Sequence, residues 1–532
     1  MRWMAITIIV LSMAAARGQA APTQPVRTQP VRTQPAPTQP ATRPETHAEH
    51  PAQRPVVSSP TTGEDKISVT HHFVKVNGIR INYEAAAGTM MMKDEFGKPR
   101  ANFFFVSYTK EPAARPEDRP ITFVFNGGPG AAAVWLHLGA AGPKRIALEH
   151  DGIPGPPPHG LIDNDQTWLD VSDLVFIDPV GTGYSRPAAG QKASDFYGVQ
   201  PDLESISEFI RLYLTRYERW DSPKFLAGES YGTTRAAALS SYLLDHDGID
   251  LNGIILLSTV LNFQTLDPAD GNDLPYALYL PSYTAIALYH HKLETAEEDL
   301  LLNEVQQYAL HDYLDALARG GALTKDARDD VVAHLARYTG LPPELIDRAN
   351  LRIGPNMFRK QLLIDQRLII GRYDGRISGL DANPAAGYPQ YDPSFSLYLP
   401  VYAGAFNDYV RRQLKYDSDL DYKVLSDTVG PWDFGRDGGA GGYLDVTGDL
   451  RSAMLDNPNL KVLVCSGYED LATPFLATKY TFDHLDLTDR LQSNVTQTFY
   501  HSGHMIYQDP AALRQLKQNV AAFITSATKP GG

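Results

Sequence analysis

Cysteine is almost absent from this sequence, since its 532 residues include only Cys465. A single cysteine excludes any disulfide within the chain, so the fold must rely on its hydrophobic core, which a chain of this length can supply. Cys465 closes the apolar run 461–465, Lys-Val-Leu-Val-Cys. This setting favours a buried small side chain over a catalytic thiol.

Long apolar runs and an excess of positive charge are also missing. The apolar stretch 4–16 is too short for a comfortable membrane span and no comparable run follows it, so we expect no stable membrane insertion. The formal net charge of −14 argues against nucleic acid as a partner, because a phosphate backbone is bound by clustered Lys and Arg. Hydrophobic residues make up 43% and charged residues 21%, so most of the chain is expected to fold.

The first 64 residues read as a leader followed by a spacer. Arg2, the apolar stretch 4–16 and the small residues around Ala20 are typical of a signal peptide over residues 1–20. No cysteine lies near the cleavage region, which disfavours a lipoprotein anchor, so we expect export to the periplasm or the extracellular space. Residues 21–64 are rich in Pro, Thr and Gln and predict a disordered linker, with binding to cell-wall material as an alternative role.

Strand patterns begin at about residue 67. Alternating segments at 67–76 and 80–84 flank Asn77-Gly78, a hairpin signal, and another strand is predicted at 101–108. Five short runs are wholly apolar, which is typical of strands buried on both faces of a parallel sheet. These runs are 121–125, 174–177, 225–227, 254–257 and 462–465. Helical periodicity at 202–217 and after Asp509 completes an α/β architecture with flanking helices.

Residues 264–440 interrupt this alternation. Helices are predicted at 294–317 and 325–337, followed by Pro-rich and aromatic loops at 382–402. A block of this kind between two sheet strands predicts a lid or cap insertion. The mature chain would then consist of a first core part at 65–263, the lid at 264–440 and a second core part at 441–532.

The strongest chemical signal is Gly-Glu-Ser-Tyr-Gly at 228–232, which fits the pattern G-x-S-x-G. A strand at 224–227 precedes it and an Ala/Leu-rich helix at 234–244 follows, as a strained nucleophile turn requires. The turn also brings the hydroxyl of Ser230 to a helix N-terminus, where developing negative charge is favoured. Ser230 is therefore the predicted nucleophile of a serine hydrolase.

A serine nucleophile needs a base and an orienting carboxylate, in the chain order Ser, Asp, His for this fold. Both Glu469 and Asp470 follow the strand at 461–465 and qualify by chemistry. For the base, His504 lies on a loop before the terminal helix, and His501 competes with it. Two further histidine pairs lack metal-ligand company, so no metal site is predicted at them. These pairs are His71-His72 and His290-His291.

Two glycine-rich loops follow strands. Asn-Gly-Gly-Pro-Gly at 126–130 would let a backbone N–H group approach a ligand closely and serve an oxyanion hole, with a plain tight turn as the alternative. Gly-Thr-Gly at 181–183 lacks the third glycine and the acidic partner of a dinucleotide site. We interpret it as a structural loop beside the active site.

Together these residues resemble the serine carboxypeptidases, peptidase family S10. Three clusters carry the likeness: Asn-Gly-Gly-Pro-Gly at 126–130, Gly-Glu-Ser-Tyr at 228–231 and Gly-His-Met at 503–505. Supporting matches lie at 173–185 and 462–470. The likeness runs in register from about 120 to 258 and from about 445 to 525, without covering the lid. It implies an α/β-hydrolase fold with a mostly parallel central sheet.

The resemblance implies roles that the residues alone left open. It selects Asp470 and His504 as partners of Ser230, and the backbone N–H groups of Gly128 and Tyr231 as oxyanion donors. The substrate-binding residues that it implies are Asn126, Gly127, Glu229 and Met505. Among these, Asn126 and a protonated Glu229 would hold the free carboxylate of the peptide's last residue. Because an ionised Glu would repel that carboxylate, the resemblance predicts better peptide binding at mildly acidic pH.

Three departures from the family pattern are visible. The family's Cys-Ser-Ser is replaced by three alanines at 131–133, consistent with the missing disulfides. The family's second carboxylate-binding glutamate falls at Ala140, which leaves Glu229 without that partner. The turn reads Ser-Tyr-Gly-Thr where Ser-Tyr-Ala-Gly is commoner, and Gly232 is compatible with the turn.

The expected function is therefore a serine carboxypeptidase that acts on peptides outside the cytoplasm and needs no metal or organic cofactor. Its substrates would be peptides with a free C-terminal carboxylate. Ala140 motivates an esterase or acyltransferase as the alternative. An alternative of another class is a catalytically silent protein that only binds peptide or wall material.

Overall fold

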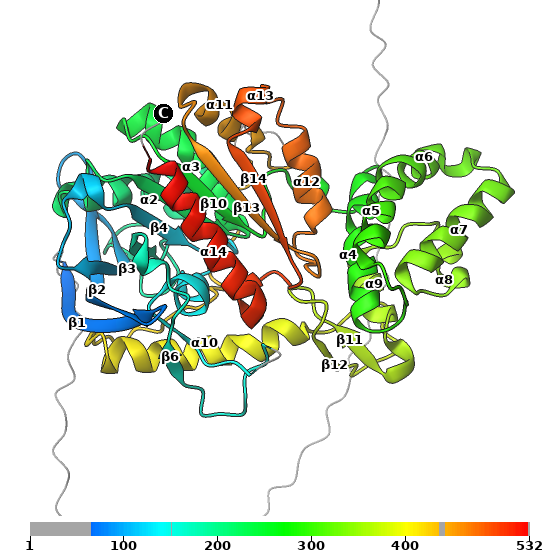
Figure 1. Ribbon diagram of the computed structural model, residues 1–532, viewed down its shortest axis with the longest axis horizontal. Helices are drawn as coiled ribbons and strands as arrows, with labels where there is room; N and C mark the ends of the chain where they lie inside the picture. Colours follow the sequence, from blue (N-terminus) through cyan, green and yellow to red (C-terminus); the bar gives the residue numbers. More distant parts are fainter. Residues whose placement is uncertain (1–64, 150–151, 436–441, 530–532) are drawn as a thin grey trace, which may run out of the picture. The chain divides into compact units, whose positions relative to one another are not determined.

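A central β-sheet organises the protein (Figure 1). The computed structural model describes residues 65–149, 152–435 and 442–529, so the predicted leader and linker lie outside the described residues. Within that part of the chain the sheet has ten strands in the order β1-β2-β3-β7-β4-β9-β10-β13-β14, with β8 paired to β3. The strands are β1 Lys66–Val76, β2 Ile79–Lys93, β3 Pro99–Glu111, β4 Ile121–Phe125, β7 Asp173–Ile177, β8 Arg186–Pro187, β9 Lys224–Glu229, β10 Gly253–Leu257, β13 Lys461–Gly467 and β14 Val495–Tyr500.

The sheet has an antiparallel edge and a parallel centre. Strands β1, β2 and β3 pair antiparallel, joined first through the predicted turn at Asn77-Gly78. Strand β2 runs to Lys93, well beyond the predicted 80–84. From β7 to β14 all neighbours are parallel, and the five wholly apolar runs are these buried strands, apart from β14.

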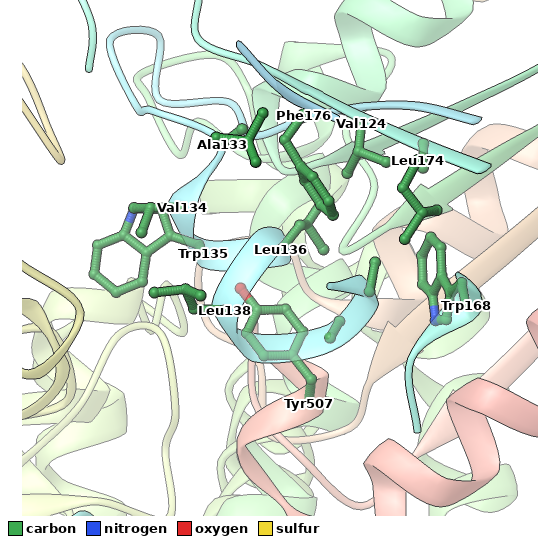
Figure 2. Close-up of a cluster of buried hydrophobic side chains, with 14 of the residues drawn as sticks. Val124, Ala133, Val134, Trp135, Leu136, Leu138, Trp168, Leu174, Phe176 and Tyr507 are labelled. Atoms are coloured by element: carbon green, nitrogen blue, oxygen red, sulfur yellow. The ribbon is translucent and has the colours of Figure 1, made fainter. Parts of the chain in front are cut away.

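Each central strand contributes to two cores. On β10, Ile255 and Leu257 belong to one cluster, whereas Ile254 and Leu256 belong to the cluster on the opposite face. Successive side chains of a strand point to opposite faces, so an apolar run with both faces covered buries every residue. Figure 2 shows part of the first cluster, where Val124, Leu174 and Phe176 of the strands meet Leu136 and Trp168.

Helices pack on both faces of the sheet. Helices α2 and α3 pack on each other, and α11 packs on α3, over one face of the sheet, whereas α14 contacts β10 and β13 on the other face. The predicted helices at 202–217, at 234–244 and after Asp509 are thus confirmed, with ends that differ by a few residues. The bounds are α1 Val134–Leu136, α2 Val199–Arg216, α3 Tyr231–Asp247, α11 Thr447–Asp456, α12 Phe475–Asp483, α13 Asp489–Gln492 and α14 Pro510–Ala527. This is the expected α/β-hydrolase fold.

A long helical segment separates two neighbouring strands. β10 and β13 are hydrogen-bonded to each other, yet about 200 residues of chain lie between them, including the helices on the green to yellow part of Figure 1. Helix α4 packs on α12, and the small sheets β5–β6 and β11–β12 lie apart from the main one. The elements of this segment are α4 Leu274–Tyr289, α5 Glu298–Tyr308, α6 Leu314–Arg319, α7 Lys325–Thr339, α8 Pro343–Arg348, α9 Pro355–Gln361, β11 Leu368–Ile370, β12 Ser378–Leu380 and α10 Pro393–Arg412. The strands β5 Lys144–Ile146 and β6 Leu161–Asp163 come earlier in the chain, between β4 and β7.

Two predictions within this segment were wrong in detail. The loops expected at 382–402 end at Asp392, because its side chain caps helix α10 by accepting from the Phe395 N–H at 3.1 Å. Pro393 occupies the first helical position, where its missing N–H costs nothing. The helix expected at 294–317 begins only at Glu298 and is interrupted by a π-turn at Ala309–Tyr313.

Two further observations concern membrane-crossing helices and the single cysteine. In the described residues no helix combines the length and the apolar character that a membrane crossing needs. Cys465 lies on β13 and is fully buried, as expected. Burial raises the pKa of its thiol to about 11.

Candidate active site

Ser230 occupies a strained turn between β9 and α3. Its backbone has φ 60° and ψ −130°, a region that non-glycine residues adopt only when the surroundings enforce it. The Ser230 N–H donates to the carbonyl of Leu257 at 3.0 Å, which holds the turn against the next strand. A Cβ at Gly228 would lie 2.1 Å from the Gly232 carbonyl oxygen, so the small residues on both sides of the serine are required for the sharp reversal.

His504 and Asp470 form a buried acid–base pair. The Nδ1 atom of His504 lies 2.8 Å from Oδ2 of Asp470, and both side chains are almost fully buried. Burial alone lowers the pKa of His504, but the Asp470 carboxylate outweighs it, so the pKa is raised overall. The hydrogen bond to Nδ1 leaves Nε2 as the nitrogen that faces the cleft. Ser230 lines the same cleft, without a direct hydrogen bond to His504; such bonds often tighten only when substrate is bound.

Asp470 is itself fixed by three further donors. The N–H groups of Ala472 and Thr473 donate to its Oδ1, at 2.7 and 3.0 Å, and the Thr473 hydroxyl donates to its Oδ2 at 2.7 Å. Sequence reasoning did not find Thr473, because a threonine three residues after an acid is an ordinary turn pattern. These bonds fix the direction of the Asp470 carboxylate toward the histidine.

The competing residues lie elsewhere. The His501 side chain is 59% exposed, and its Nδ1 is 3.6 Å from the buried carboxylate of Glu469. Burial raises the pKa of Glu469, and the hydrogen bond to this carboxylate raises the pKa of His501. Neither residue lines the cleft that contains Ser230. The geometry therefore brings together Ser230, Asp470 and His504, and leaves Glu469 and His501 in a separate pair.

The loop 126–130 lies directly on the serine turn. A Cβ at Gly127 would come within 2.4 Å of the Tyr231 nitrogen, and Gly128 has φ +101°, so both positions depend on glycine. Gly128 and Tyr231, the predicted oxyanion donors, both line the cleft that contains Ser230.

A buried arginine that the sequence analysis missed holds this loop in place. Arg235 of α3 donates to both carboxylate oxygens of Asp202 on α2, at 2.6 and 3.1 Å, and to the carbonyl of Asn126 at 2.6 Å. All three residues are buried. Arg235 therefore connects two helices of the core to Asn126, the first residue of the loop 126–130.

Asn126 and Glu229 form the other polar pair of the cleft. The Leu136 N–H donates to Oδ1 of Asn126, so its amide nitrogen faces Glu229 and donates to Oε1 at 3.0 Å. The second oxygen of Glu229 is buried without a hydrogen bond of good geometry. Burial raises the pKa of Glu229 to about 7, partly opposed by the nearby His504. Glu229 thus carries a proton in mildly acidic solution.

The position of the missing family glutamate is filled by packing. Ala140 lies fully buried in a π-turn, His137–Ala141, and its carbonyl accepts from the Asn164 amide. A Cβ at the neighbouring Gly139 would lie 2.3 Å from the ring of Tyr507. Figure 2 shows this tyrosine beside the segment that carries Leu138. An aromatic ring from the loop after His504 therefore occupies this region, and its phenol lies near the Glu229 carboxyl.

The remaining cleft lining is mostly apolar. The cleft measures about 140 Å³. Met505, predicted as a substrate-binding residue, and Tyr373 belong to the lining, and the Tyr373 ring lies 5.3 Å from that of His504. The lining comprises Asn126, Gly127, Gly128, Ala131, Trp135, Glu229, Ser230, Tyr231, Val260, Phe263, Leu266, Arg372, Tyr373, Phe395, Leu425, Ala472, Thr473, His504 and Met505.

The loop 181–183 has a structural explanation. Gly183 approaches Asp178 so closely that a Cβ would collide with its carboxylate, and Asp178 accepts from the Ala133 N–H at 2.8 Å.

The expectation that His71 lacks potential ligand neighbours was wrong. It lies with Glu84 and Glu111, their ligand atoms within 4.8 Å of one another, and it already pairs with Glu111. The two acids are distant in sequence, which hid them.

Comparisons with known proteins identify the family. A sequence profile described as serine carboxypeptidase matches residues 87–526, most of the chain. The chain belongs to the serine carboxypeptidase family. Two members from Arabidopsis thaliana, serine carboxypeptidase-like 5 and serine carboxypeptidase-like 1, are 30% and 28% identical to it over 151 and 172 residues.

These matches differ in extent. The two plant serine carboxypeptidase-like proteins align with 26% and 30% of this chain, and the chain spans only 33% and 37% of their length. Kex1, a prohormone-processing carboxypeptidase from Saccharomyces cerevisiae, has a solved structure that covers 83% of this chain and 91% of its own, with a TM-score of 0.51. At 17% identity, this likeness concerns the fold.

Proposed function

We propose that the protein is a serine carboxypeptidase that removes the last residue of peptides outside the cytoplasm. The observation that carries the proposal is the pairing of Asn126 with a buried, protonatable Glu229 at the residue before the nucleophile. A neutral carboxyl group and an amide both donate hydrogen bonds to a carboxylate. This pair is therefore suited to bind the free C-terminal carboxylate of a peptide.

In the proposed reaction, the hydroxyl of Ser230 attacks the carbonyl of the last peptide bond while Nε2 of His504 takes its proton. The N–H groups of Gly128 and Tyr231 donate to the resulting oxyanion. The imidazolium, stabilised by Asp470, then protonates the leaving amine, and an acyl-enzyme remains. Water, deprotonated by His504, hydrolyses this ester and releases the shortened peptide.

The pH dependence follows from two groups with opposite requirements. Peptide binding weakens as pH rises through about 7, because Glu229 then ionises and repels the substrate carboxylate. The base works only when His504 is neutral, and its raised pKa delays this state on going up in pH. The expected profile for peptides is a bell with a maximum at mildly acidic to neutral pH.

A second candidate, an esterase or acyltransferase, is favoured by Ala140. Without a second glutamate at that position, the pair of Asn126 and Glu229 binds the carboxylate alone. The same Ser230 and His504 would then transfer acyl groups from substrates that carry no free carboxylate.

One experiment separates the two candidates. The rate kcat/KM is measured from pH 4 to 9 for a blocked dipeptide, its C-terminal amide and a matched ester, with wild-type enzyme, Glu229→Gln and Ser230→Ala. We expect the free acid to be preferred over the amide, and its alkaline limb near pH 7 to disappear in Glu229→Gln, whose amide never ionises. Ser230→Ala should lose at least three orders of magnitude on all substrates.

The opposite outcomes are equally clear. An amide cleaved as fast as the free acid, with an ester faster than both, would favour the esterase. Full peptide hydrolysis by Ser230→Ala would contradict the mechanism for either candidate.

A further inference from the structure

The active-site cleft has one permanently charged side chain, Arg372. Of the other ionisable groups in its lining, Glu229 is neutral in mildly acidic solution and His504 is the base. Most of the remaining lining is aromatic or aliphatic, with Trp135 and Phe395 among the largest members. A fixed cation in a mostly apolar cleft distinguishes substrates by charge.

The backbone of Arg372 is held at the rim from both sides. Its N–H donates to the Asp392 carboxylate at 2.8 Å, and its carbonyl accepts from the Leu471 N–H at 3.1 Å. Leu471 directly follows the catalytic-site acid Asp470. The guanidinium lies over the ring of Tyr373, 5.5 Å from its centre, and that ring in turn contacts His504. The arginine is therefore positioned by the same segments that position the acid–base pair.

The guanidinium has no acidic partner among the described residues, and the residue is exposed. Its neighbours in the chain and in space are paired: Arg376 with Asp374 at 2.8 Å, and Arg359 with Asp392 at 3.3 Å. The charge of Arg372 acts on the reacting centre, since it opposes protonation of His504. Within the described chain Arg372 is therefore a cation that belongs to the cleft lining and forms no ion pair.

We propose that Arg372 selects peptides with an acidic side chain next to the bond that is cleaved. A guanidinium presents its donors in a planar fork that matches a carboxylate, which an apolar cleft cannot offer. The proposal rests on the proposed function, because the two carboxylates of such a substrate need two devices. Asn126 and Glu229 would take the terminal carboxylate, and Arg372 would take the carboxylate of the side chain.

The test compares matched peptides that differ in one charge. Blocked dipeptides carry Glu, Gln or Lys at the position before the scissile bond, and a second set carries them after it. The ratio of kcat/KM for Glu over Gln is measured at pH 6 and 0.15 M salt for the wild type, Arg372→Met and Arg372→Glu. Arg412→Met is the control, because Arg412 lies on α10 with its side chain 80% exposed and paired to Asp408.

We expect the wild type to prefer Glu over Gln by about tenfold or more in one of the two sets, which also identifies the position. The ratio should fall to within about twofold of unity in Arg372→Met and shift toward Lys in Arg372→Glu. Arg412→Met should keep the wild-type ratio. Thermal unfolding of each variant checks that the fold is intact.

Two results would overturn the proposal. One is a Glu-to-Gln ratio that Arg372→Met leaves unchanged in both sets. The other is an equal loss on every substrate with a free terminal carboxylate, which would assign the arginine to that group. If the wild type cleaves only esters, the proposed function fails by itself, and the Glu-to-Gln ratio measured on esters still decides the role of Arg372.

Discussion

Gly127 is a residue at which a single methyl group should have a large effect on activity. A Cβ there would lie 2.4 Å from the Tyr231 nitrogen and 2.6 Å from that of Gly232, and backbone atoms cannot move aside cheaply. Gly127→Ala should therefore push the loop 126–130 away from the turn at Ser230 and lower kcat on an ester at least about 100-fold. Gly160→Ala is the matched control, because its Cβ meets nothing within 4 Å. Activity of Gly127→Ala within threefold of the wild type would contradict this view of the loop.

Single residues of the site were predictable to different degrees. Ser230 follows from its five-residue pattern between a strand and a helix, which is local information. Glu469 and Asp470 are equivalent by chemistry and differ only in which side of the turn each faces, so the residues alone could not choose. Arg235 escaped prediction because it stands in an Ala-rich helix, and its partner Asp202 is 33 residues away.

Among the elements, the pair of helices α2 and α3 depends on one buried ion pair. Removing the arginine in Arg235→Met leaves the buried Asp202 carboxylate without compensation, so we expect a loss of about 3–5 kcal/mol in the free energy of unfolding. Urea denaturation measures it. Arg235→Met should also lower kcat, because the Asn126 carbonyl loses its donor. The double variant Asp202→Leu/Arg235→Met should regain part of the stability, because no unpaired carboxylate remains, but it should not regain kcat.

The control for this experiment is a surface ion pair between the same two helices, Arg211 of α2 with Asp247 of α3. Arg211 is 45% exposed and only 3.9 Å from Asp247, so Arg211→Met should change the free energy of unfolding by less than about 0.5 kcal/mol. If Arg235→Met were equally mild, the ion pair would not be what holds the two helices and the loop together.

Elements were predictable where their pattern is uniform. The buried parallel strands are short, wholly apolar and separated by helices, so their residues identify them without tertiary information. Helix α10 was not predictable in this way, because Pro393 and Pro400 and a run of aromatics are typical of a loop. Its tyrosines at 398, 402 and 409 become a buried stripe only when distant residues such as Trp135 and His137 are present to pack against.

For the whole molecule, Glu229 connects stability to pH. The folded protein keeps its proton up to about pH 7, whereas the unfolded chain releases it near the ordinary value of 4.5. The folded state thus binds more protons between these values, and its stability from this group falls as pH rises. His137 acts in the opposite direction, since burial lowers its pKa to about 3, so the total curve does not isolate either group.

The variant Glu229→Gln isolates the contribution of Glu229 to the pH dependence of stability. The stability of Glu229→Gln minus that of the wild type should grow by an amount on the order of 3 kcal/mol between pH 4.5 and pH 8, because the amide has no proton to lose. Urea denaturation at both values measures the change. The exposed Glu344→Gln serves as control and should show a difference that is constant within about 0.5 kcal/mol. A constant difference for Glu229→Gln as well would mean that this carboxyl group ionises normally in the folded protein.

The single cysteine can report on local opening of the core. Cys465 is a fully buried residue of β13, and burial raises the pKa of its thiol to about 11, so reagents that attack thiolates do not react with it in the native state. Labelling then requires an opening that uncovers the face of β13 on which Cys465 packs with residues of α14. Because the chain holds no second thiol, the rate of labelling measures how often this part of the core opens in the population, with no engineered probe.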